Sequence, residues 1–202
     1  MRPALFWLAT AALTVACGAS PGDSPGTGPD GGGSNAPDGS GGGGATDGLL
    51  PLDVGRVWTY DVTSTYASCP GGRHDQRVTG TSSVEGRDVF EVAGFCGLTG
   101  RTHVEGNIVE DYYDWGPTGW YRSLDEPVAD GHTWTTTNGS ATFTQTYDEL
   151  GAYGGREDCW KVIQNVSYKS EWIYCRGVGL VAYEMVDLAG GTIRAELVST
   201  SF

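Results

Sequence analysis

Residues 57–66 read Val-Trp-Thr-Tyr-Asp-Val-Thr-Ser-Thr-Tyr, a stretch in which large apolar side chains alternate with polar ones. Trp58, Tyr60 and Val62 therefore fall on one face of an extended strand, and the polar residues between them fall on the other. Residues 141–147 repeat the pattern, with alanine, phenylalanine and tyrosine alternating with threonines. Strands with one buried face and one wet face are typical of antiparallel sheets. These stretches predict an all-β domain.

The rest of the chain after Leu49 has the same texture. Short runs of Val, Thr, Tyr, Trp and Ile are separated by Gly, Asn-Gly or Asp-Gly, which are hairpin signals. Apolar residues do not keep helical spacing over several turns. We therefore expect residues 49–202 to form an antiparallel meander that closes into an open or partial barrel or a sandwich.

Three motif pairs recur in the same order along this domain. They are Gly55-Arg56-Val57-Trp58-Thr59 with Gly131-His132-Thr133-Trp134-Thr135, Gly86-Arg87 with Gly155-Arg156, and Gly106-Asn107-Ile108-Val109 with Gly177-Val178-Gly179-Leu180-Val181. The recurrence predicts two similar halves, about 50–123 and 126–199, with a buried tryptophan anchoring each. Chance recurrence in a domain rich in Trp and Gly is the alternative.

Two of these stretches also carry a family resemblance. Residues 51–60 fit a Pro-Leu-x-Val-Gly-x-x-Trp-x-Tyr opening motif, and residues 177–181 fit a Gly-Val-Gly-Leu-Val closing motif. Together they resemble a group of exported bacterial lipoproteins, mostly uncharacterised, over most of 50–200. The resemblance implies a β-rich fold and no particular activity.

Four of the five cysteines can be paired by strand register. In a hairpin over 157–176, pairing Cys159 with Cys175 sets Trp160 opposite Tyr174, so that covalent geometry and aromatic packing agree.

The other two cysteines are expected to lie together at one end of the sheet. Strands over 56–66, 73–84 and 87–94 would bring Cys69 and Cys96 there, and export favours their oxidation. A four-cysteine metal site is the rival, but the spacings contain no Cys-x₂₋₄-Cys pair. We expect two disulfides, no bound metal and no cofactor.

The N-terminus reads as an export signal. One basic residue precedes an apolar stretch, 4–16, that is too short to span a membrane. Residues 13–17, Leu-Thr-Val-Ala-Cys, resemble the lipobox of bacterial lipoproteins, although that motif prefers leucine where Thr14 stands. We expect a signal peptide over 1–16 and a lipidated Cys17; cleavage near Ala19 into a soluble protein is the alternative.

Cysteine parity agrees with lipidation, because using Cys17 leaves four cysteines to pair. Gly18 follows in place of aspartate, which by resemblance to the known sorting rule points to the outer membrane. Residues 18–48 are Gly, Ser, Pro, Asp, Thr, Asn and Ala only. Such a composition predicts a disordered tether over 17–48.

Charge restricts the partners. The net charge is −13, and residues 49–202 alone hold 21 acidic and 11 basic side chains. A surface of this sign disfavours nucleic acid. It also gives no help with docking onto anionic headgroups, so we expect membrane contact through the lipid only. We expect the domain to be a monomer.

Residues 110–121 form the densest acidic and aromatic cluster. Tyr113, Trp115, Trp120 and Tyr121 are the candidates for a ligand platform, with a packed core as the other interpretation. Strand alternation points the neighbouring carboxylates, Glu110 and Asp111, to opposite faces.

Catalytic motifs are not visible in the sequence. The three histidines have no ligand spacing, and neither Gly-x-Ser-x-Gly nor Ser-x-x-Lys occurs in residues 49–202. We therefore predict a lipid-anchored envelope module that binds a protein, glycan or lipid without catalysis. The alternative is an enzyme of unrecognised type, or a carbohydrate-binding module, that uses residues 110–121.

Overall fold

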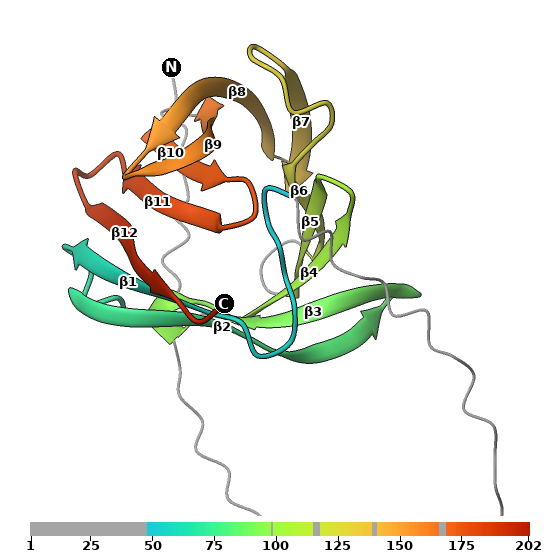
Figure 1. Cartoon of the computed structure of the whole chain (residues 1–202), viewed down its shortest axis with the longest axis horizontal. Helices are drawn as coiled ribbons and strands as arrows, with labels where there is room; N and C mark the ends of the chain where they lie inside the picture. Colours follow the sequence, from blue (N-terminus) through green and yellow to red (C-terminus); the bar gives the residue numbers. More distant parts are fainter. Residues whose placement is uncertain (1–47, 98, 115–117, 139–140, 166–168) are drawn as a thin grey trace, which may run out of the picture. The chain divides into compact units, whose positions relative to one another are not determined.

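The computed structural model describes residues 48–202, except 98, 115–117, 139–140 and 166–168 (Figure 1). The described part forms twelve antiparallel strands and one 3-10 turn, Phe95–Gly97. The strands are β1 (Val57–Ser64), β2 (Gly72–Val84), β3 (Arg87–Ala93), β4 (Thr99–Glu105), β5 (Ile108–Tyr113), β6 (Gly119–Leu124), β7 (Thr133–Asn138), β8 (Ala141–Tyr153), β9 (Arg156–Asn165), β10 (Lys169–Cys175), β11 (Gly179–Val186) and β12 (Thr192–Thr200). The prediction of an all-β meander is confirmed. The expected signal peptide and nearly all of the expected tether lie outside the described residues.

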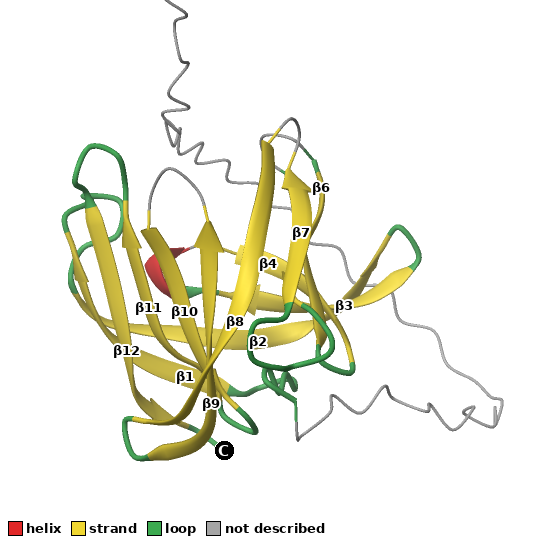
Figure 2. Ribbon diagram, turned by 90° about the horizontal axis from the view of Figure 1, so that it is seen from above, coloured by secondary structure: helices red, strands yellow, loops and turns green. Residues whose placement is uncertain are grey.

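All twelve strands belong to one sheet, in the order β6-β5-β4-β3-β2-β1-β12-β11-β10-β9-β8-β7. Each half of the chain contributes a six-stranded meander, and β1 pairs with β12 to join the two halves. The sheet curls into a nearly closed barrel that brings its two end strands, β6 and β7, side by side (Figures 1 and 2).

The two junctions between the halves are built differently. At the first, the ladder seam, β1 and β12 pair from Trp58 opposite Thr200 to Ser64 opposite Ile193. At the second, the side-chain seam, β6 and β7 share no ladder in the described part of the chain. There the Thr136 hydroxyl accepts from the backbone N–H of Arg122 at 3.0 Å.

Glycines occupy corresponding turns in the two meanders. Gly86, with φ of +81°, lies between β2 and β3, and Gly155, with φ of +78°, lies between β8 and β9. Both turns need the left-handed conformation that glycine adopts without a steric cost. Gly106 and Gly177 likewise lie in the β4–β5 and β10–β11 turns, also with positive φ.

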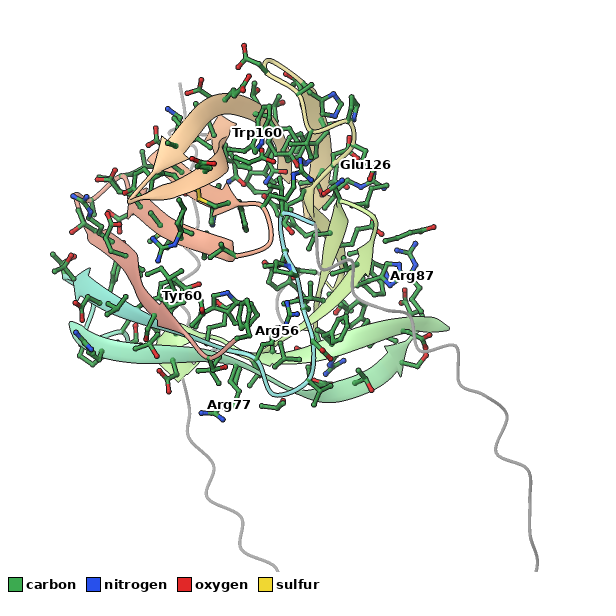
Figure 3. All side chains as sticks on the ribbon, viewed as in Figure 1. Arg56, Tyr60, Arg77, Arg87, Glu126 and Trp160 are labelled. Atoms are coloured by element: carbon green, nitrogen blue, oxygen red, sulfur yellow. A yellow bond between two sulfur atoms is a disulfide. The ribbon has the colours of Figure 1, made fainter. Side chains whose placement is uncertain are left out.

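The core follows the alternation of the strands. Trp58, Tyr60 and Val62 point inward and are 1%, 0% and 3% exposed, as the sequence predicts. Tyr60 and Trp160 lie inside the ring of strands, whereas Arg77 lies on the outer surface (Figure 3). One face of the sheet is therefore the core and the other is solvated.

The buried tryptophans of the two motif copies have different surroundings. The Trp58 indole donates to the carbonyl oxygen of Val178 at 2.6 Å, and Gly179 lies so close that a Cβ there would come within 3.0 Å of the indole nitrogen. Trp134, 6% exposed, packs on Tyr147 with ring centroids 4.7 Å apart. Burial of both tryptophans is confirmed. The closing motif, 177–181, packs on the first tryptophan.

Residues 48–56, cyan in Figure 1, seal one end of the barrel, here called the plugged end. Leu49 and Leu52 are 0% and 2% exposed and belong to the core. The backbone N–H of Leu49 donates to the Asn107 side chain, and the Gly48 carbonyl accepts from the N–H of Gly177. The chain before β1 is thus tied to two hairpin turns.

Both predicted disulfides are present. Cys159 and Cys175 are opposite each other in β9 and β10, with Cα atoms 4.0 Å apart, and Trp160 faces Tyr174 as the register argument requires. The second bridge joins Cys69, in the β1–β2 connection, to Cys96, with Cα atoms 4.7 Å apart.

Candidate functional site

The candidate site is a cavity inside the barrel, on the inward face of β4, β5 and β6. Strand register builds it, because Thr102 of β4 and Tyr121 of β6 flank Asp111 of β5 in the sheet. Side chains at directly opposed positions share a face, so these three residues point into the barrel together. Tyr113, two residues after Asp111, has the same orientation.

The cavity is partly enclosed and has a volume of about 240 Å³. Its walls combine apolar side chains from the plug and the sheet with polar groups from β2, β4, β5 and β6. The lining residues are Leu50, Leu52, Gln76, Val92, Gly94, Thr99, Gly100, Thr102, Asp111, Tyr112, Tyr113, Ser123, Tyr174 and Leu180. A mostly apolar concavity with a few convergent polar groups is the usual form of a small-molecule site.

A wider depression of about 530 Å³ lies at the plugged end, lined by Asn107, Glu126, Pro127, Val128 and Arg176. It is open to solvent and shallow, so a ligand there would stay largely hydrated. We therefore take the interior cavity as the candidate site.

Asp111 is the one ionisable carboxylate among the described residues of the cavity wall. Burial raises its pKa above the usual value, and hydrogen bonds from Thr102 and Ser123 partly oppose that shift. The Thr102 hydroxyl donates to Asp111 Oδ1 at 2.7 Å. No arginine, lysine or histidine is among the described residues that line the cavity. The carboxylate is therefore held by hydroxyl groups and has no cationic partner there.

Tyrosines surround this carboxylate. Burial, followed by the charge of Asp111, raises the pKa of Tyr113 and that of Tyr174 far above the usual value. Both phenols consequently remain protonated at neutral pH. They present aromatic faces and neutral hydroxyls to the interior.

A second polar group lies deeper in the barrel. Tyr121 donates to Gln164 Oε1, and the side-chain amide of Gln145 donates to the Tyr121 oxygen at 2.7 Å. Gln145 is 1% exposed, and its Oε1 has no hydrogen-bond partner among the described residues. A buried acceptor without a partner is costly, so a donor from water or from a ligand is expected there.

The predicted platform residues are divided between the two faces of the sheet. Tyr113 and Tyr121 face the interior, and their rings are 6.0 Å apart. Trp120 faces outward, where its indole donates to Glu85 at 2.8 Å and its ring lies 4.7 Å from the Arg87 guanidinium. Trp115 lies outside the described residues. The structure thus places Tyr113 in the cavity wall with Tyr121 beside it, and does not join Trp120 to them.

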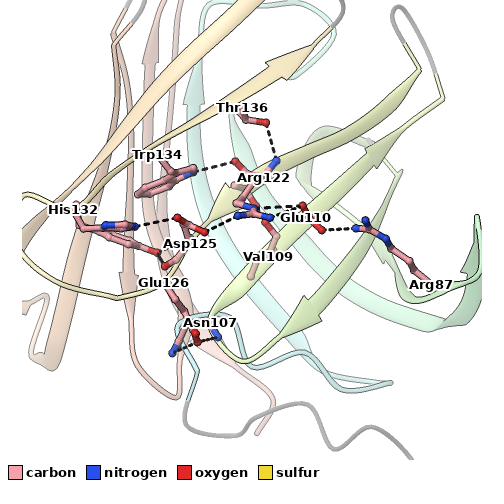
Figure 4. Close-up of polar contacts among 12 residues, drawn as sticks. Arg87, Asn107, Val109, Glu110, Arg122, Asp125, Glu126, His132, Trp134 and Thr136 are labelled. Atoms are coloured by element: carbon pink, nitrogen blue, oxygen red, sulfur yellow. Dashed lines mark hydrogen bonds and ion pairs between the residues drawn. The ribbon is translucent and has the colours of Figure 1, made fainter.

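Glu110 points away from Asp111, as alternation predicts. On the outer face it accepts from Arg87 and from Arg122, whose guanidinium also donates to Asp125 at 2.9 Å (Figure 4). His132 Nε2 lies 3.0 Å from the other carboxylate oxygen of Asp125. These ion pairs bind β3, β5 and β6 to the β6–β7 connection and do not reach the cavity.

Sequence reasoning missed Gln76, Gln145 and Gln164 as interior groups. Gln145 occupies an inward position of the 141–147 alternation, between Phe143 and Tyr147, and that position was the available signal. The other two were not detectable without the strand register. The contribution of residues 48–56 to the cavity wall had no sequence signal.

The described residues contain no group of three or more histidine, cysteine or acidic side chains placed to hold a metal ion. No helix in that part of the chain combines the length and the apolar character needed to cross a membrane.

Comparisons with known proteins identify no family. No family model matches the chain, and no curated protein matches it in sequence. Among solved structures, it is similar to a candidate lipoprotein from Parabacteroides distasonis, with 9% sequence identity and a TM-score of 0.38, over 76% of this chain and 98% of that one. A likeness of this size assigns no function.

Proposed function

We propose that the chain is an exported lipoprotein whose barrel holds a small organic ligand in the interior cavity. The observation that carries this proposal is the Asp111 cavity, where a carboxylate with no cationic partner among the described lining residues lies among hydroxyl groups, tyrosines and leucines. A barrel that needed only to fill its core would place an apolar side chain at that position, because burying a carboxylate costs free energy.

Binding has more support than catalysis. His74, His103 and His132 bond to Pro70 O, Asp88 O and Asp125, and none of them lines the cavity. The hydroxyl groups nearest to Asp111, those of Thr102 and Ser123, therefore have no adjacent histidine base among the described residues. The carboxylate and hydroxyl groups are better suited to orienting a ligand.

The proposal is tested with a residue that can fill the cavity. Gly100 lines the cavity on the same face as Val92, and a Cβ at this position would meet nothing within 4 Å. Gly100→Leu should therefore occupy the cavity without straining the backbone. Gly80, whose Cβ would also meet nothing within 4 Å, pairs with Glu91 on β3 and provides the matched control, Gly80→Leu.

The measurement is a thermal-shift screen of small cationic, neutral and anionic organic compounds, glucose included, against the wild type and both variants. We expect at least one compound to raise the Tm of the wild type and of Gly80→Leu, but not that of Gly100→Leu. If every compound leaves the wild type unchanged, or shifts Gly100→Leu equally, the proposal is wrong.

The location is proposed from the N-terminal sequence, with Cys17 as the lipidated residue, 1–16 as the signal peptide and 17–48 as the tether. Several acyl chains would anchor the chain durably, and Gly18 favours the outer membrane. Mass spectrometry of the mature protein should find a lipid-modified N-terminal Cys17. An unmodified terminus further along the chain would contradict the anchor and leave the cavity proposal intact.

We also propose that the barrel is an internal duplication. Six strands per half, glycines in corresponding turns and a buried tryptophan at each start support it. A chain made of two tandem copies of 126–199 should then fold into a closed barrel with one set of backbone NMR signals. An unfolded or asymmetric product would count against duplication.

A further inference from the structure

We propose that the ligand of the cavity is a small organic cation, an alkyl- or arylammonium ion, bound at the carboxylate of Asp111. This inference rests on the proposed binding function and specifies its ligand class. Its basis is the contrast between one interior carboxylate and the absence of any basic side chain among the described lining residues.

The polar partners of Asp111 are an incomplete substitute for water. Thr102 and Ser123 supply hydroxyl hydrogen bonds, and these do not overcome the effect of burial on the carboxyl group. An ionised carboxylate in such a place is stabilised most by a hydrogen-bonding positive charge. An ammonium group supplies that charge and three donors, whereas an alcohol supplies one donor and no charge.

The arginines of the neighbouring strands are not available for this role. Arg87 and Arg122 pair with Glu110 on the outer face, and Arg101 pairs with Asp114 at 2.6 Å. These three arginines are thus engaged with carboxylates other than Asp111, and the inner carboxylate is left for a cation from solution.

The remaining walls suit the organic part of such a cation. Tyr113 and Tyr174 offer aromatic faces, which attract ammonium ions. Leu50, Leu52 and Leu180 offer apolar surface for a short alkyl or aryl group. With about 240 Å³ available, the cavity encloses an amine of roughly ten non-hydrogen atoms, whereas most of a lipid or an oligosaccharide would lie outside it.

The net charge of the whole chain also favours a cationic ligand. The net charge of −13 raises the local concentration of cations and lowers that of anions. It supplies no specificity, which must come from Asp111 and the cavity walls. Carboxylate or phosphate ligands would meet repulsion both outside and inside the barrel.

Ligand binding is coupled to a proton. Burial raises the pKa of Asp111, so lowering the pH protonates the carboxyl group and removes the charge that binds the ammonium. The titratable groups facing it are the phenols of Tyr113, Tyr121 and Tyr174. The pKa values of Tyr113 and Tyr174 are raised far above the neutral range, so these two do not change charge there. The affinity for an ammonium ion should therefore fall as the pH falls through the pKa of Asp111.

The experiment compares benzylammonium chloride with benzyl alcohol by isothermal titration calorimetry. The chain is used in the processed form that an exporting bacterial host produces. Asp111→Asn removes the charge with little change of shape, Gly100→Leu fills the cavity, and Asp88→Asn, an exposed position in β3, is the control for charge alone. Circular dichroism at each stage establishes that the variants are folded.

We expect the wild type and Asp88→Asn to bind benzylammonium at least roughly tenfold more tightly than benzyl alcohol. Asp111→Asn should lose that preference, and Gly100→Leu should bind neither compound. Equal affinity of the wild type for both compounds, an undiminished preference in Asp111→Asn, or no binding of benzylammonium would overturn the cation assignment. Binding of neutral compounds that Gly100→Leu abolishes would still support the cavity, so the two proposals fail separately.

Discussion

The two seams that close the barrel achieve the same connection by different means. The ladder seam pairs β1 with β12 through backbone groups, with one bulge near Thr59. At the side-chain seam, no strand pairs with β6 on its β7 side, and both backbone groups of Arg122 bond to side chains of β7 instead. Its N–H donates to the Thr136 hydroxyl at 3.0 Å, and its carbonyl accepts from the Trp134 indole at 3.3 Å.

This difference determines how each seam depends on sequence. Backbone groups are present at every position, so a ladder tolerates most substitutions that keep the inward and outward alternation. The side-chain seam depends on the particular hydroxyl of Thr136 and the indole of Trp134. One of its two strands, β6, carries Ser123 of the cavity, and the strand next to β6, β5, carries Asp111. Single substitutions should therefore weaken this seam selectively.

The largest expected effect is that of removing the tryptophan at each seam. Trp58→Ala and Trp134→Ala should each lower the free energy of unfolding by about 3–5 kcal/mol, because each deletes a large buried side chain together with its indole hydrogen bond. Denaturant titration gives the free energies, and hydrogen exchange separates the two variants. Trp134→Ala should release the amides of β6 first. Loss of protection in β1 and β12 in both variants would remove the distinction between the seams.

A smaller effect should come from Thr136→Val. It keeps the shape of the side chain but leaves the Arg122 N–H without its acceptor, at a cost of about 1–3 kcal/mol. Thr59→Val in β1 is the control, since the Thr59 hydroxyl bonds to the exposed Asp75 and its loss should change stability by at most about 0.5 kcal/mol. Equal costs in the two variants would show that the side-chain seam is no more sensitive than the ladder.

Local patterns in the sequence predict the buried face of a strand and the register of one hairpin, but give no sign of either seam. Alternation at Trp58 and Tyr60 predicts the buried face of β1, and the Cys159–Cys175 pairing predicts the register of β9 and β10, because both depend on a few neighbouring residues. The contact of Arg122 with Thr136 depends on curvature accumulated over twelve strands. No short stretch of sequence encodes that sum.

The candidate site shows the same limit. Alternation separates Glu110 from Asp111 but does not say which of the two is inside. The answer depends on the pairing of Asp111 with Thr102 and Tyr121, which is a property of the folded sheet. The acidic and aromatic cluster lies on β5 and β6, two of the strands that line the cavity. It also included Trp120, whose place on the outer face follows from the same alternation.

Asp111→Asn tests the cavity wall beside the side-chain seam, and unlike the substitutions above it should raise the stability of the protein. In the unfolded chain Asp111 ionises near its ordinary pKa of 3.8, whereas burial raises the native pKa. Stability is thus lost as the pH rises from the unfolded toward the native pKa. Asp111→Asn should raise the Tm at neutral pH, and the gain should vanish below about pH 4. A Tm series over pH with Asp88→Asn as control tests this, and a lower Tm for Asp111→Asn at neutral pH would contradict it.

The smallest expected effect separates the side chain of Arg122 from its backbone. Arg122→Ala removes the ion pairs to Glu110 and Asp125 but leaves the backbone bonds to Thr136 and Trp134 in place. Each carboxylate keeps another partner, Arg87 for Glu110 and His132 for Asp125. The Arg122 side chain is 38% exposed, so solvent screens its ion pairs and they contribute little. We expect a loss of about 0.2–1 kcal/mol that shrinks with added salt, less than that of Thr136→Val. A salt-independent loss above that of Thr136→Val would mean that the ion-pair chain, and not the backbone of β6, holds the seam closed.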